Sequence, residues 1–314
     1  PSANPERESG GAVITTRSED RGSHTRYGEE QLNYLVPVPG SCRESECIVI
    51  VFPHAGGSPR QYVHWPQMYR RLAVGKEPEP KVLGVTYPLR DHASYSNPAR
   101  DLQALSTDIA REVLFTVERL GAVARPERIC RVVLAGHSLG AIVAFEVLRE
   151  LARLLPGRRL PTLLISGQVT PEHAGGGTFH RSSDMELINE LGRMDPRTAV
   201  VLSDPEMASL HLPAIREDYR LIETYRCQPV GDDRSRDREA NEKLNTKIVI
   251  VKGDSDSELM DAHINGWARW VREVDGPFTV PGDHMHHITR NELAYLAKLY
   301  ACRESPVTTV KGMK

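Results

Sequence analysis

The pentapeptide Gly-His-Ser-Leu-Gly at residues 136–140 constrains the fold of this chain more than any other feature of its sequence. An apolar run over residues 131–135 precedes it, and residues 141–148 follow with apolar side chains at helical spacing. Glycines on both sides of a serine permit a tight strand-to-helix turn that exposes the serine hydroxyl above the edge of a sheet. The alternative is an inert Ser138 that only caps the helix. Candidate partners for the serine further along the chain favour the first interpretation.

Short apolar runs alternate with helical patterns over most of the chain. Such runs occupy residues 47–52, 81–87, 131–135, 162–166 and 247–251. Nearly every residue in them is apolar, as in parallel strands that are buried on both faces. Between the runs, Leu102, Leu105, Ile109 and Val113 form one helical stripe. The alternation predicts an α/β fold with a mostly parallel, doubly wound sheet and right-handed crossovers.

The domain boundaries follow from changes in composition along the chain. Residues 1–44 are mainly polar and charged, so we expect a disordered extension there, followed by one α/β domain over residues 45–302. Residues 303–314 are expected to be a short tail. From about 182 to 226 the pattern is purely helical, which favours a lid over the carboxyl ends of the strands, although additional packing helices would read the same way. The charged stretch 231–243 predicts a solvated loop.

Composition narrows the classes of partner. The chain has 314 residues and a net charge of -2, with its basic residues scattered, which gives no electrostatic case for nucleic-acid binding. Its 5 cysteines show no CxxC spacing, which indicates a reducing compartment. There is no signal-peptide pattern and no apolar run of membrane-spanning length. We therefore expect a cytoplasmic monomer that binds neither nucleic acid nor membrane.

A serine nucleophile needs a base within hydrogen-bond reach and an acid that orients the base. When the serine follows a strand in this way, the three groups occur in the order serine, acid, histidine. The run 247–251 is followed by two carboxylates, of which Asp256 fits G-x-x-D spacing better than Asp254, while Asp261 is a third candidate. His284, after the apolar stretch 277–280, is the predicted base.

Two further features bear on the site. His286 and His287 follow His284 closely in the sequence and form a histidine cluster with it. No second cluster supplies distant metal ligands, so we expect no metal site and assign His286 and His287 to the surface or to packing. Acyl transfer also requires backbone donors for an oxyanion. We assign these to the N–H groups of Leu139 and Ala55, with Gly56 and Gly57 shaping the loop 52–58. The alternative for that loop is an ordinary strand-to-helix turn.

Several short motifs together resemble one family, the type II thioesterases that accompany modular polyketide synthases and nonribosomal peptide synthetases. The motifs are FPHAGGS at 52–58, Trp65, GHSLG at 136–140, LPAIREDYRLIETY at 212–225, GDSD at 253–256 and PGDH at 281–284. Two positions depart from the usual pattern. The family's PGR element reads Pro-Leu-Arg at residues 88–90, and its PGGHF element reads Pro-Gly-Asp-His-Met at 281–285.

The resemblance implies an α/β-hydrolase fold with a helical lid insertion. It also implies nucleophile Ser138, base His284, acid Asp256 and oxyanion donors Ala55 and Leu139. The activity it implies is hydrolysis of acyl thioesters on the phosphopantetheine arm of acyl or peptidyl carrier proteins, which edits or unloads a synthase. No separate cofactor is expected, because the substrate itself carries the phosphopantetheine. Acyl transfer to another acceptor and a catalytically vestigial carrier-binding module are the alternatives.

The loop and the lid are expected to supply the acyl-binding surface. From the loop we assign His54, Gly56 and Gly57. The lid has more apolar residues than two helices need for packing on each other, and its candidates are Leu187, Leu191, Met207, Leu210 and Ile215. One methylene of fit is worth only about 1–3 kcal/mol, so we expect a broad preference for small acyl groups.

Overall fold

The computed structural model describes residues 34–43, 45, 47–73, 79–90, 97–119, 131–228, 243–259, 264–288, 295, 296 and 298. The predictions for residues 1–33, for most of the charged loop 231–243 and for the tail 303–314 lie outside these residues.

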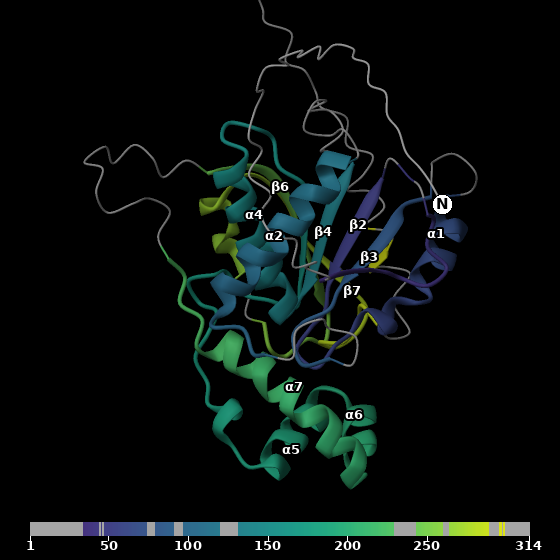
Figure 1. The fold of residues 1–314 in the computed structure, drawn as a ribbon, viewed down its shortest axis with the longest axis vertical. Helices are drawn as coiled ribbons and strands as arrows, with labels where there is room; N and C mark the ends of the chain where they lie inside the picture. Colours follow the sequence, from purple (N-terminus) through teal and green to yellow (C-terminus); the bar gives the residue numbers. More distant parts are fainter. Residues whose placement is uncertain are drawn as a thin grey trace, which may run out of the picture. The chain divides into compact units, whose positions relative to one another are not determined.

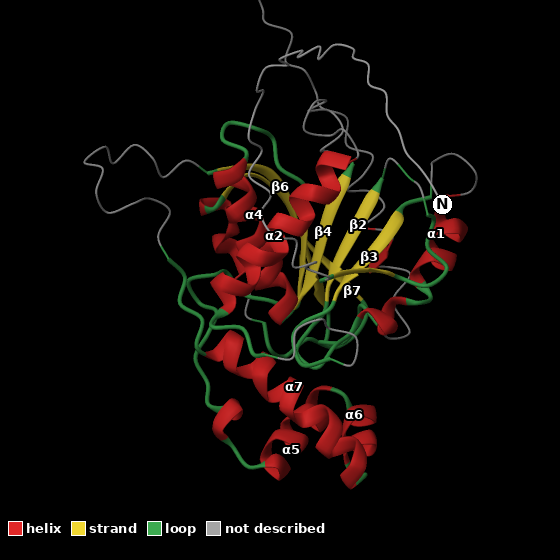
Figure 2. Ribbon diagram, viewed as in Figure 1, coloured by secondary structure: helices red, strands yellow, loops and turns green. Residues whose placement is uncertain are grey.

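Within the described residues the strands form one seven-stranded sheet in the order β1-β3-β2-β4-β5-β6-β7 (Figures 1 and 2). The strands are β1 (Leu35–Pro37), β2 (Ile48–Phe52), β3 (Lys81–Val85), β4 (Val132–His137), β5 (Thr162–Ser166), β6 (Leu244–Gly253) and β7 (Val271–Val280). β1 pairs antiparallel with β3, and every other pair is parallel. The mostly parallel α/β sheet expected from the apolar runs is confirmed.

Alternate residues of the central strands pack on opposite faces of the sheet. In β2, Ile48, Ile50 and Phe52 belong to one core cluster, and Val49 and Val51 belong to the other. The helices α2 (Leu102–Arg119) and α4 (Leu139–Leu154) cover the first face and lie together in Figure 1. On the second face lie side chains of η1 (Pro59–Tyr62) and α1 (Trp65–Ala73). Both faces are therefore covered, which is why these strands read as continuous apolar runs.

The sheet edges differ from the sequence expectation. The predicted disordered extension 1–44 is wrong for its last part, because β1 pairs with β3 and Tyr34 and Val38 are buried. The N–H groups of Tyr34 and Leu35 also donate to the Glu112 carboxylate, at 2.7 and 3.1 Å. A strand of three residues is too short to produce a readable alternation. β7 extends well before the expected stretch 277–280, because its exposed outer residues hid the pattern.

The lid (residues 182–226) contains α5 (Asp184–Met194), α6 (Pro196–Leu202) and α7 (Pro205–Glu223), one helix more than the two expected from the sequence. Ser183, Asp195 and Asp204 cap the three N-termini with their side chains, as short polar residues do best. The lid has its own core, made by Leu187, Leu191, Leu202, Leu212, Ile215 and Tyr219. None of the helices in the described ranges combines the length and apolar character needed to cross a membrane.

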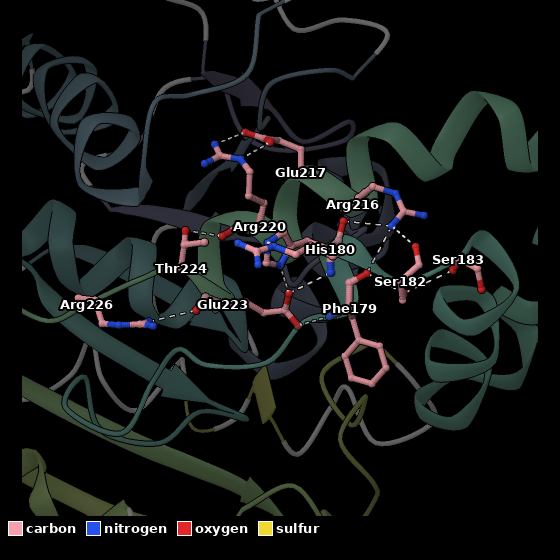
Figure 3. A network of polar contacts seen from close by, with 11 residues as sticks. Phe179, His180, Ser182, Ser183, Arg216, Glu217, Arg220, Glu223, Thr224 and Arg226 are labelled. Atoms are coloured by element: carbon pink, nitrogen blue, oxygen red, sulfur yellow. Dashed lines mark hydrogen bonds and ion pairs between the residues drawn. The ribbon is translucent and has the colours of Figure 1, made fainter.

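A polar network fastens the start of the lid to α7 (Figure 3). The Glu223 carboxylate accepts hydrogen bonds from the N–H groups of Phe179 and His180 and contacts the His180 ring. The Arg216 guanidinium donates to the carbonyls of Phe179, His180 and Ser182. These hydrogen bonds join the connection between β5 and α5 to α7, the last helix of the lid.

Candidate active site

Ser138 occupies the turn between β4 and α4 in a left-handed backbone conformation, with φ 52° and ψ -123°. Few residues other than glycine adopt such a conformation, and they cluster at functional sites. The glycines at 136 and 140 are required sterically. A Cβ on Gly136 would lie 2.4 Å from the Gly140 carbonyl oxygen, and one on Gly140 would lie 2.0 Å from that of Phe52. The Ser138 N–H donates to the Ser166 carbonyl at 2.9 Å, which ties the turn to β5.

The structure brings together the predicted base and one of the candidate acids. His284 Nδ1 lies 3.1 Å from Asp256 Oδ2, and the Asp256 side chain is completely buried. Burial alone would raise the pKa of Asp256, but the hydrogen bond and charge of His284 hold that pKa below its usual value. Asp254 instead is exposed and caps its loop, accepting the Gly282 N–H at 3.0 Å and the Ser255 hydroxyl. Asp261 lies outside the described residues.

Ser138 and His284 face one pocket of about 360 Å³ at the carboxyl ends of the strands, beneath the lid. This position is where ligands bind in open α/β sheets, and the volume is that of a small-molecule site. Among the described residues no hydrogen bond joins the Ser138 hydroxyl to His284. Catalytic hydrogen bonds are often long without substrate and tighten when it binds.

The two assigned oxyanion donors are available to a ligand. Neither the Ala55 N–H nor the Leu139 N–H has an acceptor in the part of the chain that the structure describes. Leu139 opens α4, where the helix dipole also favours negative charge. Ala55 lies in a turn that the Gly57 N–H closes on the His54 carbonyl, at 2.8 Å, with Gly56 at φ +80°. Both residues line the pocket.

A buried cluster of histidines lies behind the base. His137 stacks on His287 at 3.7 Å between ring centroids and lies 4.8 Å from His284. His286 and His287, assigned from the sequence to the surface or to packing, are both buried and pack in this cluster. No group of three metal-ligating side chains suited to a metal ion occurs within the described residues.

The hydrogen bonds of this cluster define its tautomers. His286 Nδ1 must carry the proton that it donates to the Asp283 carbonyl, at 3.0 Å. In a neutral imidazole its Nε2 then accepts from the Ser166 hydroxyl, whose oxygen accepts from His137 Nδ1, at 2.9 and 2.8 Å. Burial lowers the pKa of His137 and of His287 well below the ordinary value, and that of His54 to about 3. The cluster is therefore neutral around pH 7.

Replacing His287 by phenylalanine is expected to reduce the loss of stability in acid. The unfolded chain protonates this histidine below about pH 6.5, whereas the folded protein does not, because the pKa of buried His287 lies well below that value. The free energy of unfolding therefore decreases as the pH is lowered below about 6.5, by about 1.4 kcal/mol per pH unit for one such group. Urea unfolding at pH 7.5 and 5.5 should show the variant losing roughly 1 kcal/mol less than the wild type.

Exposed His64 supplies the control for this measurement. His64→Phe should retain the wild-type dependence on pH. An unchanged dependence in His287→Phe would show that the buried ring takes up protons in the folded state.

The expected acyl-binding residues divide into two groups. His54, Gly56, Leu191 and Ile215 line the pocket. The assignment of the other four is corrected. Leu187 is fully buried in the lid core, Leu210 is 54% exposed, and neither Met207 nor Gly57 is part of the pocket lining. Helical periodicity identified apolar positions in the lid, but it does not determine which side of a helix faces the pocket.

Some pocket residues were missed, and for most of them the sequence carries no local signal. These residues are Gln61 in η1, Gln168 and His173 in the connection after β5, and Glu190 in α5. Gln168 alone had a usable signal, because it lies two residues after the end of the strand β5.

Comparison with known proteins agrees with this site. The thioesterase domain family model matches residues 47–300. A probable cadicidin biosynthesis thioesterase from Streptomyces griseus is 29% identical over 230 residues, which cover 73% of this chain and 54% of that protein, so the chain spans about half of its length. Thioesterase PikA5 from Streptomyces venezuelae is 29% identical over 258 residues, 82% of this chain and 78% of that protein.

A solved structure shows the same fold. The type II thioesterase BorB from the borrelidin biosynthetic cluster has a TM-score of 0.62 and 27% identity, with 86% of this chain and 95% of that chain covered. The lid-covered pocket, the serine turn and a family match over most of the sequence agree, and the chain belongs to the thioesterase domain family, with an α/β-hydrolase fold.

Proposed function

We propose that this protein hydrolyses acyl thioesters held on the phosphopantetheine arm of acyl or peptidyl carrier proteins. The observation that carries the proposal is the strained Ser138 turn facing the same pocket as the hydrogen-bonded pair His284 and Asp256. The relatives named above, with their roles in biosynthesis, support a carrier-bound substrate. The role of such an enzyme is to release blocking acyl groups from a synthase.

The residues have distinct roles in the proposed reaction. His284 Nε2 removes the proton from the Ser138 hydroxyl as the oxygen attacks the thioester carbonyl carbon. Asp256 accepts from His284 Nδ1 and stabilises the imidazolium that forms. The N–H groups of Ala55 and Leu139 donate to the oxyanion. His284 then protonates the leaving thiol, and water activated by the same histidine releases the free acid and regenerates Ser138.

The other expectations about this enzyme stay proposals. It needs no cofactor of its own, because the phosphopantetheine arrives with the carrier protein. A monomeric state and a cytoplasmic location also stay predictions.

Mass spectrometry of acyl-carrier proteins incubated with the enzyme tests the proposal. The wild-type protein should convert short acyl carriers to the free phosphopantetheine form, and Ser138→Ala should not. Ser203→Ala, which alters an exposed serine of the lid, should behave as the wild type. Turnover of simple acyl esters without any release from carriers would overturn the carrier-protein substrate and leave a different hydrolase.

The acyl profile should change when the pocket wall changes. Leu191 lines the pocket from α5, so Leu191→Ala should enlarge it and favour longer chains by about tenfold, the lower end of the effect of one methylene. Leu187, one turn earlier on α5, is the matched control, because it is fully buried in the lid core and does not line the pocket. Its alanine variant should lower the melting temperature and leave the profile unchanged. Identical profiles for both variants would show that the lid does not select the acyl chain.

A further inference from the structure

Asp218, on the lid helix α7, has a side chain only 1% exposed and no role in the reaction as described above. Its carboxylate accepts the Gly56 N–H at 2.8 Å. It also accepts hydrogen bonds from both terminal nitrogens of Arg90, with Arg90 Nη1 at 2.9 Å from Oδ1. A carboxylate at this depth needs such partners, because an unpaired buried charge is strongly destabilising. Gly56 and Asp218 are 162 residues apart in sequence, so tertiary packing alone joins them.

The hydrogen-bonded pair Asp218 and Arg90 holds the turn that contains the Ala55 oxyanion donor. The Gly56 N–H belongs to the peptide between Ala55 and Gly56, so the carboxylate holds the centre of the turn His54–Gly57. Arg90 extends the same bridge to the Gly57 carbonyl, at 3.3 Å. The Gly56 N–H and the Gly57 carbonyl are thereby engaged, while the Ala55 N–H has no acceptor among the described residues and stays available to a ligand.

A second side chain of α7 contacts the same turn. Ile215 precedes Asp218 by three residues, so the two lie on one face of the helix. A Cβ on Gly56 would lie 3.3 Å from Ile215, closer than ordinary van der Waals contact, and Ala55 packs against the cluster that contains Ile215. The helix therefore restrains the turn by packing and by a charge-assisted hydrogen bond together.

The backbone next to Arg90 is strained. Leu89 has φ 63°, a left-handed conformation that is costly for a residue with a Cβ. Such strain persists only where surrounding contacts impose it, and it gathers at functional sites. Arg90 donates to the Pro88 carbonyl as well as to Asp218, so the contacts of its guanidinium span the strained residue.

We propose that Asp218 is a positioning residue for the reaction, whose carboxylate, paired with Arg90, orients the Ala55 N–H toward the thioester oxygen. This inference rests on the proposed function. Because Asp218 stands on the lid, the oxyanion site is complete only when α7 is in place. Placement of the lid over a bound acyl group and activation of its carbonyl are then one event.

Substitution of Asp218 tests the inference, with a p-nitrophenyl acyl ester as the substrate. Asp218→Asn keeps the shape of the side chain and loses its charge. We expect kcat to fall by about 100-fold, the lower range for loss of an oxyanion donor, with KM almost unchanged. Binding of a boronic acid, which mimics the tetrahedral intermediate, should weaken by a similar factor. Binding of a thioether analogue of the acyl substrate should stay as in the wild type.

Glu217 supplies the matched control. It is also a buried carboxylate of α7, and its partner Arg220 donates to the Ala99 carbonyl of the main domain, but within the described residues none of its hydrogen bonds reaches the turn. Glu217→Gln should lower the melting temperature to a similar extent and leave kcat and boronic-acid binding unchanged. Equal effects of the two variants on kcat would overturn the inference and leave Asp218 as a structural anchor.

Two additions keep the test decisive. If Asp218→Asn does not fold, Asp218→Glu retains the charge but displaces the carboxylate by one methylene, and its kcat must then fall while the protein stays folded. Wild-type kcat in a folded Asp218→Glu protein would overturn the positioning role. The ester substrate separates this outcome from a failure of the proposed function, because ester turnover requires the oxyanion site whether or not carrier proteins are the natural substrates.

Discussion

Alanine in place of Ser138 is expected to reduce thioester hydrolysis by a factor on the order of 10⁴ or more, the loss seen when a member of such a triad is removed. The substitution removes one oxygen that makes no hydrogen bond within the described residues. The backbone contacts of the turn persist, because the Ser138 N–H still donates to Ser166 and its carbonyl still accepts the Ala141 N–H. The melting temperature should therefore change little.

Turnover of an acyl-carrier protein, labelling by a fluorophosphonate and thermal unfolding together measure this outcome. The alanine variant should be folded, unlabelled and inactive. Near wild-type turnover in a folded Ser138→Ala protein would exclude the serine mechanism and direct attention to a different nucleophile in the pocket.

Substitution of the two aspartates should separate an acid that orients the base from one that caps a loop. Asp256→Asn is expected to lower kcat by a factor on the order of 10⁴, because an amide favours the wrong imidazole tautomer and cannot stabilise the imidazolium. The 3.1 Å contact with His284 Nδ1 and the complete burial of Asp256 are the reasons for this ranking. Asp254→Asn should cost only a few-fold, since the exposed amide oxygen can still accept the Gly282 N–H.

Steady-state kinetics of both variants against pH measure the difference. The pKa of Asp256 is held below its usual value, so the carboxylate is ionised at neutral pH, and activity should not depend on its titration there. The opposite order of the two rates would assign the acid to Asp254 and show that G-x-x-D spacing is misleading in this chain.

The parts of the site that adjacent residues encode were predictable. Close approaches of the backbone leave no room for a Cβ at Gly136 or Gly140, so the motif predicts the turn where it stands between a strand and a helix, as it does here. The strands were readable because a strand buried on both faces is apolar at nearly every position. The choice of Asp256 over Asp254 also followed from local spacing, and the structure places Asp256 and not Asp254 beside His284.

The sequence predictions failed or stayed open where the role of a residue depends on contacts with residues that are distant in sequence. β1 is stabilised by its pairing with β3 and by Glu112, neither of which is near it in sequence. Leu187 and Leu191 lie one turn apart on the same helix. Leu187 packs only in the lid core, whereas Leu191 also lines the pocket. His286 and His287 do pack, against His137, as one of their two expected roles allowed, but the sequence did not decide between that role and a place on the surface.

The sequence by itself determined the fold class, the serine turn and the order of the candidate catalytic groups. These properties depend on steric limits and apolar periodicity within a few residues of each position. Only the tertiary structure decided which lid side chains reach the pocket, and it alone joined Asp218 to the turn around Ala55. The physical reason is the range of the interactions. A hydrogen bond between Gly56 and Asp218 exists only after two separate segments have packed, and nothing near either residue encodes its partner.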